Sequence, residues 1–196
     1  MKRIVILASG NGTNAENIVK HFKGNEDVCI CRIMSNKKDA YVLTRAANLG
    51  IESSSFTKQE FEDGTVLNEI KGMNPDLIVL SGFLLKVPEA MVKAFPHKIV
   101  NIHPALLPKF GGKGMYGDRV HEAVVASGEK ESGITIHYID ENYDQGTTIF
   151  QAKCEVLPTD TPHDVATKVH ALEYQWFPKI IDKCLHTSMS TPTIPF

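Results

Sequence analysis

The sequence lacks an excess of charge of either sign. It contains 21 Lys and Arg residues against 23 Asp and Glu residues among 196, which gives a net charge of −2. Domains that bind nucleic acids carry a clear basic excess, so the composition argues against a nucleic-acid partner. A small anionic ligand stays compatible with it, because backbone N–H groups can hold an anion without a positive field from the whole protein.

Long apolar runs are also missing. No stretch approaches the ~18 apolar residues that a membrane-spanning helix needs. The apolar segment near the start, Ile4–Ala8, is short, and glycine and asparagine follow it at once. We interpret it as a first strand and not as a signal peptide. The sequence therefore predicts a cytoplasmic protein with no membrane partner.

Paired cysteines and metal-ligand spacings are absent too. None of the four cysteines forms a C-x-x-C pair, and a chain of this length does not need disulfides, which indicates reduced thiols. The eight histidines show neither H-x-x-x-H nor H-x-x-E-H spacing, so we predict no metal site. The cysteines are Cys29, Cys31, Cys154 and Cys184.

The first hundred residues alternate apolar runs with helical patterns. Runs that are apolar on both faces, each followed by a helix, are typical of a parallel sheet covered on both sides. We expect strands over residues 3–9, 28–35, 51–56, 76–83 and 98–103. We expect helices over residues 14–22, 40–49, 65–73 and 88–95.

The pattern changes in the second half. A helix over 119–127 precedes two strands, 132–140 and 147–156, and the roughly six residues between them are too few for a crossover, so they should pair antiparallel. A long helix should start near Pro162, and Pro178 should kink or end it. The prediction is one α/β domain over residues 1–196, with a Rossmann-like, mostly parallel twisted sheet, helices on both faces and the last two strands antiparallel.

A glycine loop, SGNGTNA (residues 9–15), lies between the first strand and the first helix. Gly10 and Gly12 let the backbone approach a ligand, and the helix directs its N–H groups and positive dipole end at the same place. Gly10-x-Gly12-x-x-Ala15 also matches the dinucleotide fingerprint, but the acidic residue expected at the end of the second strand is missing until Asp39. A single phosphate is favoured; a dinucleotide or a plain tight turn stays open.

The stretch NIHPALLP begins at Asn101, where an apolar strand ends. Asn101 and His103 share a face because they are two residues apart on a strand. The amide can donate to a developing oxyanion and the imidazole can move a proton near neutral pH. Asp144, in the turn YDQGTT, is either a simple turn residue or the carboxylate that holds His103 in its charged form.

Together, SGNGTN, LSGFL, NIHPALLPKF, GITIHYID and YDQGTTIFQ, in that order, resemble the glycinamide ribonucleotide formyltransferase family. The resemblance runs from residue 2 to about residue 185. It implies transfer of a formyl group from 10-formyltetrahydrofolate to the amine of 5'-phosphoribosylglycinamide in de novo purine biosynthesis. It also implies a phosphate-binding half at residues 1–100, a catalytic and folate half at 101–185, and a tail at 186–196.

The same resemblance implies roles for individual residues and a cis Leu107–Pro108 peptide bond. Asn101, His103 and Asp144 would be catalytic. Gly12, Thr13 and Asn14 would bind the substrate phosphate or ribose, and Glu173 would lie near its glycinamide end. The folate would contact Leu84, Leu85, Lys86, Val87, Asn101, Asp140 and Glu141.

Other functions stay open on the sequence alone. A 10-formyltetrahydrofolate hydrolase or a non-catalytic folate- or nucleotide-binding module would use the same scaffold. We expect the hydrolase to carry a domain ahead of residue 2, and a methionyl-tRNA formyltransferase to carry a basic C-terminal domain. The loop from Lys109 to His121 is longer than the resemblance leads us to expect. His121 and His137 are weaker candidates for the active site. The protein is predicted to be a monomer or a homodimer.

Overall fold

The computed structural model describes residues 1–140 and 146–187, and the chain divides into two compact units. The first unit is Met1–Asn101 and the second is Ile102–Phe196. The single domain expected over residues 1–196 stays a prediction.

The first unit is built on parallel strands. In it β1 pairs with both β2 and β4, β2 with β3, and β4 with β5, so the order is β3-β2-β1-β4-β5. The inner strands are apolar on both faces, and residues 4–7 of β1 and 77–80 of β4 are buried. The strands are β1 (Lys2–Leu7), β2 (Val28–Ser35), β3 (Ser53–Ser55), β4 (Leu77–Leu80) and β5 (Ile99–His103), whose last residues belong to the second unit.

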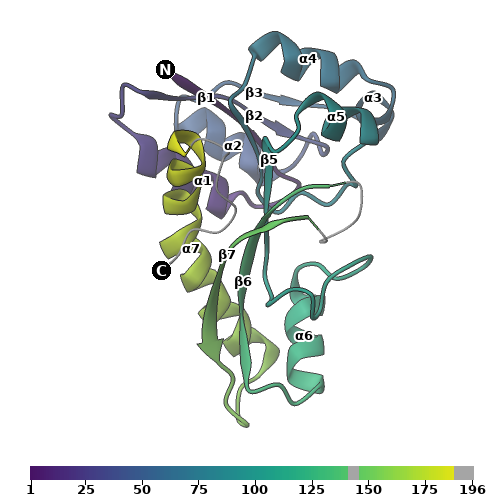
Figure 1. The fold of residues 1–196 in the computed structure, drawn as a ribbon, viewed down its shortest axis with the longest axis vertical. Coiled ribbons are helices and arrows are strands. Elements are labelled where there is room, and N and C mark those ends of the chain that lie inside the picture. The colour runs from purple at the N-terminus through teal and green to yellow at the C-terminus, as the bar shows by residue number, and fades with distance from the viewer. Residues whose placement is uncertain (141–145, 188–196) are drawn as a thin grey trace. The chain divides into compact units, whose positions relative to one another are not determined.

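Helices of the first unit cover this sheet in two groups, since α1 packs on α2 and α3 packs on α4 (Figure 1). The chain moves outward from β1 to β3 and then returns to β4 on the other side of β1. Right-handed crossovers that move in opposite directions place their helices on opposite faces, as the sequence predicted. The helices are α1 (Thr13–Phe22), α2 (Tyr41–Asn48), α3 (Lys58–Glu62), α4 (Thr65–Met73) and α5 (Glu89–Ala94).

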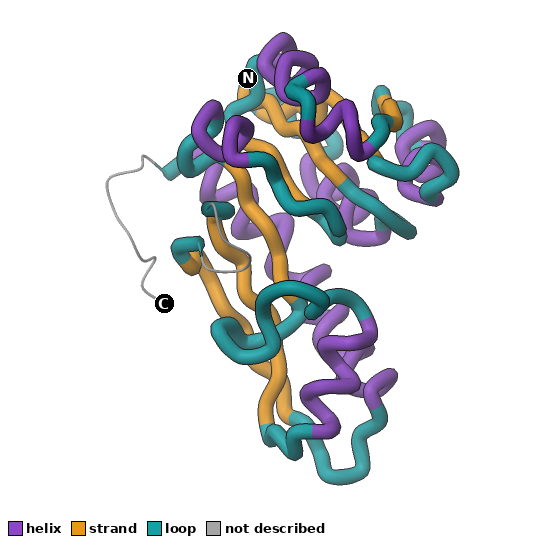
Figure 2. The backbone as a smooth tube through the Cα atoms, turned by 90° about the vertical axis from the view of Figure 1, so that its right-hand side faces the viewer, coloured by secondary structure: helices purple, strands orange, loops and turns teal. Residues whose placement is uncertain are grey.

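In the second unit a long antiparallel pair carries two helices. β6 and β7 pair antiparallel as predicted, and α7 packs on both strands and on α6 (Figure 1). The segment from residue 104 to residue 117 contains neither helix nor strand (Figure 2). The elements are α6 (Asp118–Ala126), β6 (Glu131–Tyr138), β7 (Thr148–Glu155) and α7 (Pro162–His186).

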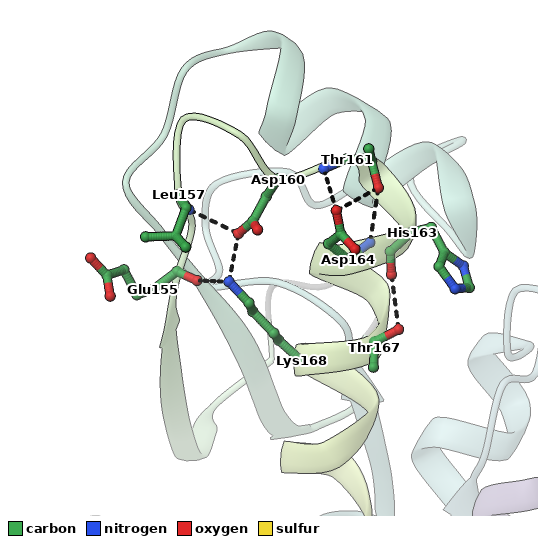
Figure 3. A network of polar contacts seen from close by, with 8 residues as sticks. All are labelled: Glu155, Leu157, Asp160, Thr161, His163, Asp164, Thr167 and Lys168. Atoms are coloured by element: carbon green, nitrogen blue, oxygen red, sulfur yellow. Dashed lines mark hydrogen bonds and ion pairs between the residues drawn. The ribbon is translucent and has the colours of Figure 1, made fainter.

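A polar network fixes the turn between β7 and α7 (Figure 3). The Thr161 hydroxyl accepts from the backbone N–H of Asp164, and the Asp164 carboxylate accepts from the backbone N–H of Thr161, which forms a capping box. Lys168 Nζ donates to Asp160 at 2.6 Å and to the Glu155 carbonyl at 3.1 Å. The hydrogen bond from Lys168 holds the pKa of Asp160 below its usual range.

The prediction was that Pro178 kinks α7 or ends it. The ending is wrong, because the helix continues to His186, and the kink stays a prediction. Proline removes one backbone hydrogen bond from a helix interior. Here Phe177, Ile180 and Ile181 around it are fully buried, and their packing keeps the helix continuous. Across the described residues, no helix is long and apolar enough to cross a membrane.

Candidate functional site

The glycine loop after β1 turns tightly onto the start of α2. Gly12 has a φ of 78° and serves as the N-cap of α1. A Cβ on Gly12 would lie 2.8 Å from the Cα of Val42 and closer still to the Val42 side chain. The Val42 N–H donates to the Gly10 carbonyl at 3.1 Å. Glycine is therefore required at position 12 for two reasons, the left-handed backbone and the close approach of α2.

The N-cap of α1 is a glycine, so its first-turn N–H groups receive no hydrogen bond from an N-cap side chain. Thr13 and Asn14 form this turn, directly after Gly12. A phosphate oxygen bound there would accept from backbone N–H groups at the positive end of the helix dipole. The binding of a substrate phosphate or ribose by Gly12, Thr13 and Asn14 stays a prediction.

Arg45, in the last turn of α2, holds the glycine loop in place. Its Nε donates to the Asn11 carbonyl at 2.7 Å, and its guanidinium also donates to Asn11 Oδ1 at 2.5 Å and 3.1 Å. It pairs with Glu16 of α1 and lies 4.9 Å from the ring centroid of Tyr41. The hydrogen bonds from Lys20 and Arg45 lower the pKa of Glu16. No pattern in the sequence pointed to Arg45, because its contacts are 29 and 34 residues away.

The segment after β4 carries the predicted folate residues. Leu84 and Lys86 are exposed, Leu85 is half-buried, and Val87 is buried beneath them. The Leu84 N–H donates to the Ser9 hydroxyl at 2.9 Å, which joins this segment to the residue that precedes the glycine loop. This hydrogen bond anchors the start of the segment, and the contact of Leu84–Val87 with a folate stays a prediction.

Asn101 and His103 lie two residues apart on β5, as predicted. Asn101 is half-buried and His103 is 4% exposed. His103 Nε2 lies 2.7 Å from the carbonyl oxygen of Phe110, and a carbonyl can only accept, so this nitrogen carries a proton. Phe110 has a φ of 56° and lies near the start of the loop from Lys109 to His121.

A second hydrogen-bond group holds the chain just after His103. The buried Thr135 hydroxyl donates to the Ala105 carbonyl at 2.7 Å and accepts from the Leu107 N–H at 3.0 Å. Gln151 Nε2 donates to the Leu107 carbonyl at 3.0 Å. The expected cis peptide between Leu107 and Pro108 is confirmed. Thr135 was missed from sequence because an isolated threonine on a strand carries no signal.

The second unit also gathers histidines near His103. His121 on α6 is 2% exposed, and its Nδ1 has no hydrogen-bond partner among the described residues. Its ring centroid lies 6.3 Å from that of His170 on α7. Burial lowers the pKa of His121, and the charges of His170 and His103 act in the same direction while Asp118 opposes them. A role for His121 in the site stays a prediction.

The remaining predicted residues stand as follows. Glu173 lies on α7 and is 6% exposed, and Asp140 is half-buried just after β6. His137 is fully buried, with Nδ1 3.1 Å from the Tyr138 carbonyl, which fits a packed core histidine. Glu141 and Asp144 lie outside the described residues, so the contact between Asp144 and His103 stays a prediction.

Comparisons with known proteins agree on one family. A family model described as Formyl transferase matches residues 2–181. The phosphoribosylglycinamide formyltransferase of Bacillus subtilis is 35% identical over 191 residues, covering 94% of this chain and 95% of that protein. The chloroplastic phosphoribosylglycinamide formyltransferase of Arabidopsis thaliana is 36% identical over 187 residues, covering 92% of this chain, but the chain spans only 64% of that protein's length. The crystal structure of the phosphoribosylglycinamide formyltransferase of Coxiella burnetii superposes with a TM-score of 0.83 at 37% identity, covering 92% of this chain and 85% of that one.

Proposed function

The chain belongs to the formyl transferase family, and from that premise we propose that it transfers a formyl group from 10-formyltetrahydrofolate to the amine of 5'-phosphoribosylglycinamide. The observation that carries this proposal is the match to the Bacillus subtilis relative of that name over almost the whole length of both chains. The reaction belongs to de novo purine biosynthesis.

The loop that would bind the phosphate and the backbone segment that would receive the folate both lie in the first unit. Gly12, Thr13 and Asn14 would bind the phosphate through the loop and the N-terminus of α1. The folate would lie against the backbone of Leu84–Val87, with Asn101, Asp140 and Glu141 as further contacts. Glu173, a buried carboxylate, would face the glycinamide end of the substrate.

The chemistry needs groups that stabilise charge and move one proton. The neutral amine attacks the formyl carbon, a tetrahedral intermediate forms, and the carbonyl oxygen becomes negative. The Asn101 amide and protonated His103 would donate hydrogen bonds to that oxygen, and Asp144 would keep His103 charged. The proton released by the new ammonium goes to the folate nitrogen as the C–N bond to the folate breaks.

The hydrogen bond to Phe110 bears on this step. Because Nε2 of His103 already carries a proton, the imidazolium forms when Nδ1 takes up the second one. His103 therefore changes charge at Nδ1, while the Phe110 carbonyl keeps the ring orientation fixed.

An absorbance assay of folate tests the proposal. The protein is mixed with 10-formyltetrahydrofolate, with and without 5'-phosphoribosylglycinamide. Loss of the formyl group that depends on the acceptor supports the transferase. Loss without acceptor indicates the hydrolase, and no loss indicates a binding module; both outcomes refute the proposal.

Variants assign the roles of the catalytic residues. His103→Ala and Asp144→Asn should each lower turnover by about 10²–10³-fold with little change in substrate affinity. His163→Ala is the matched control, because His163 is exposed at the start of α7 and contacts Thr167 only through its backbone carbonyl. Near-normal turnover in either active-site variant would exclude the role assigned to that residue.

We also propose that the protein acts in the cytoplasm on small molecules, without a nucleic-acid partner, as a monomer or a homodimer. The near-neutral net charge and the four free cysteines are consistent with this setting.

A further inference from the structure

The loops that follow β1 and β4 lie where the strand order of the first unit reverses. The two strands are parallel, but successive strands are added on opposite sides of β1, since β2 and β3 lie on one side of it and β4 lies on the other. Ligands of open α/β sheets bind outside the carboxyl ends of the strands at such a point. The glycine loop follows β1 and the Leu84–Val87 segment follows β4, so both proposed binding segments start here.

Ser9 is the residue that joins them. It is 2% exposed, and its backbone N–H donates to the Gly82 carbonyl at 3.1 Å. Its hydroxyl accepts from the Leu84 N–H at 2.9 Å and donates to Asn36 Oδ1 at 2.6 Å. One buried hydroxyl therefore links the chain after three neighbouring strands, β1, β2 and β4.

These hydrogen bonds lie beyond the last residues of β1 and β4, Leu7 and Leu80, which pair in the parallel ladder. Past that point the Ser9 N–H donates to the Gly82 carbonyl, and the Leu84 N–H donates to the Ser9 hydroxyl. The Ser9 backbone and side chain thus continue the contact between the two chain segments where the ladder has ended.

Because of this geometry, a shift of the glycine loop moves the atom that fixes the Leu84 N–H. We propose that Ser9 is a positioning residue that couples the glycine loop to the Leu84–Val87 segment, so that an anion on the loop and a folate on the segment strengthen each other's binding. The inference rests on the proposed function for the identity of the two ligands. A ligand that orders one segment lowers the entropic cost of ordering the other, and such coupling is reciprocal.

The first test reads the coupling without any assumption about catalysis. Inorganic phosphate is added to the protein, and hydrogen exchange of the Leu84 amide is followed by NMR. Phosphate should slow this exchange in the wild type and should have no effect on it in Ser9→Ala. Unchanged exchange at Leu84 in the wild type, or the same slowing in Ser9→Ala, would overturn the proposal.

The second test uses the two proposed ligands, measured by calorimetry. The affinity for 5'-phosphoribosylglycinamide should rise about 5–30-fold when tetrahydrofolate is present, within the usual range of coupling between sites. The factor should fall to about 1–2 in Ser9→Ala. Equal factors in wild type and Ser9→Ala would refute the coupling even if the enzyme transfers formyl groups normally. Conversely, a Leu84 response to phosphate without formyl transfer would refute the proposed function and leave the coupling standing.

Ser81→Ala is the matched control for both tests. Ser81 is buried like Ser9, at 5% exposure, and lies directly after β4. Its hydroxyl has no hydrogen-bond partner among the described residues. Its removal should leave the coupling intact. If Ser9→Ala does not fold, Asn36→Ala is the second variant, because it removes one partner of the Ser9 hydroxyl and keeps the hydrogen bond to Leu84. Asn36→Ala should give a coupling factor between those of the wild type and an uncoupled protein. A coupling factor equal to that of the wild type would count against the proposal.

Discussion

Replacing Gly12 by alanine tests whether the glycine loop is built as the structure shows. The φ of 78° places an L side chain in the left-handed region, which costs about 1–2 kcal/mol. The new Cβ would also lie 2.8 Å from the Val42 Cα, a backbone atom that cannot rotate away. Overpacking of this kind costs about 1–3 kcal/mol. The two effects together predict that Gly12→Ala lowers the free energy of unfolding by about 2–5 kcal/mol.

Gly64 provides a control that separates the two effects. It is also an N-cap glycine, with a φ of 92°, but nothing lies within 4 Å of a Cβ placed on it. Gly64→Ala should therefore lose only the backbone part, about 1–2 kcal/mol. Urea unfolding followed by circular dichroism gives both free energies. Equal losses in the two variants would refute the steric argument at Val42.

Three further predictions concern the supports of the site. Arg45→Ala should weaken binding of 5'-phosphoribosylglycinamide by about 5–30-fold, raising KM more than it lowers kcat, because Asn11 loses its hydrogen bonds. Arg45→Lys should recover part of the affinity, and an unchanged KM in Arg45→Ala would contradict the proposed support of the glycine loop by Arg45. Thr135→Val should destabilise the second unit by about 1–3 kcal/mol in urea unfolding, since the hydroxyl loses its hydrogen bonds with Ala105, Leu107 and Gln151. Thr135→Ser should not. As the pH falls below the ordinary His pKa of 6.5, the unfolded chain should protonate His121 before the folded protein does, so the melting temperature should fall. In His121→Gln the melting temperature should fall less, and identical pH profiles for the two proteins would contradict this prediction.

The sequence was sufficient for the features that depend on local pattern. Apolar runs on both faces predicted the parallel strands, and β2 matches its predicted range of 28–35. The six-residue gap before residue 147 forced the antiparallel pairing of β6 with β7. Gly12 at the start of α1 was recognisable because a glycine between a strand and a helix indicates a tight turn, and its φ of 78° confirms that turn.

Features that depend on distant contacts were not predictable. Helix α3 is a different case, because its local signal, the capping box of Thr57 and Glu60, was present in the sequence and was overlooked. Arg45 and Ser9 act through partners far along the chain, Asn11 and Leu84, and no local pattern marks such pairs. Pro178 is held inside α7 by tertiary packing that overrides its local preference.

The most direct test of the account supplies 10-formyltetrahydrofolate with a ¹³C label in the formyl group and follows the label by NMR. The account predicts that the label appears on the amine nitrogen of 5'-phosphoribosylglycinamide as a formamide, at a rate that His103→Ala reduces by about 10²–10³-fold. Label recovered as free formate, or left on the folate in the presence of the acceptor, would contradict it.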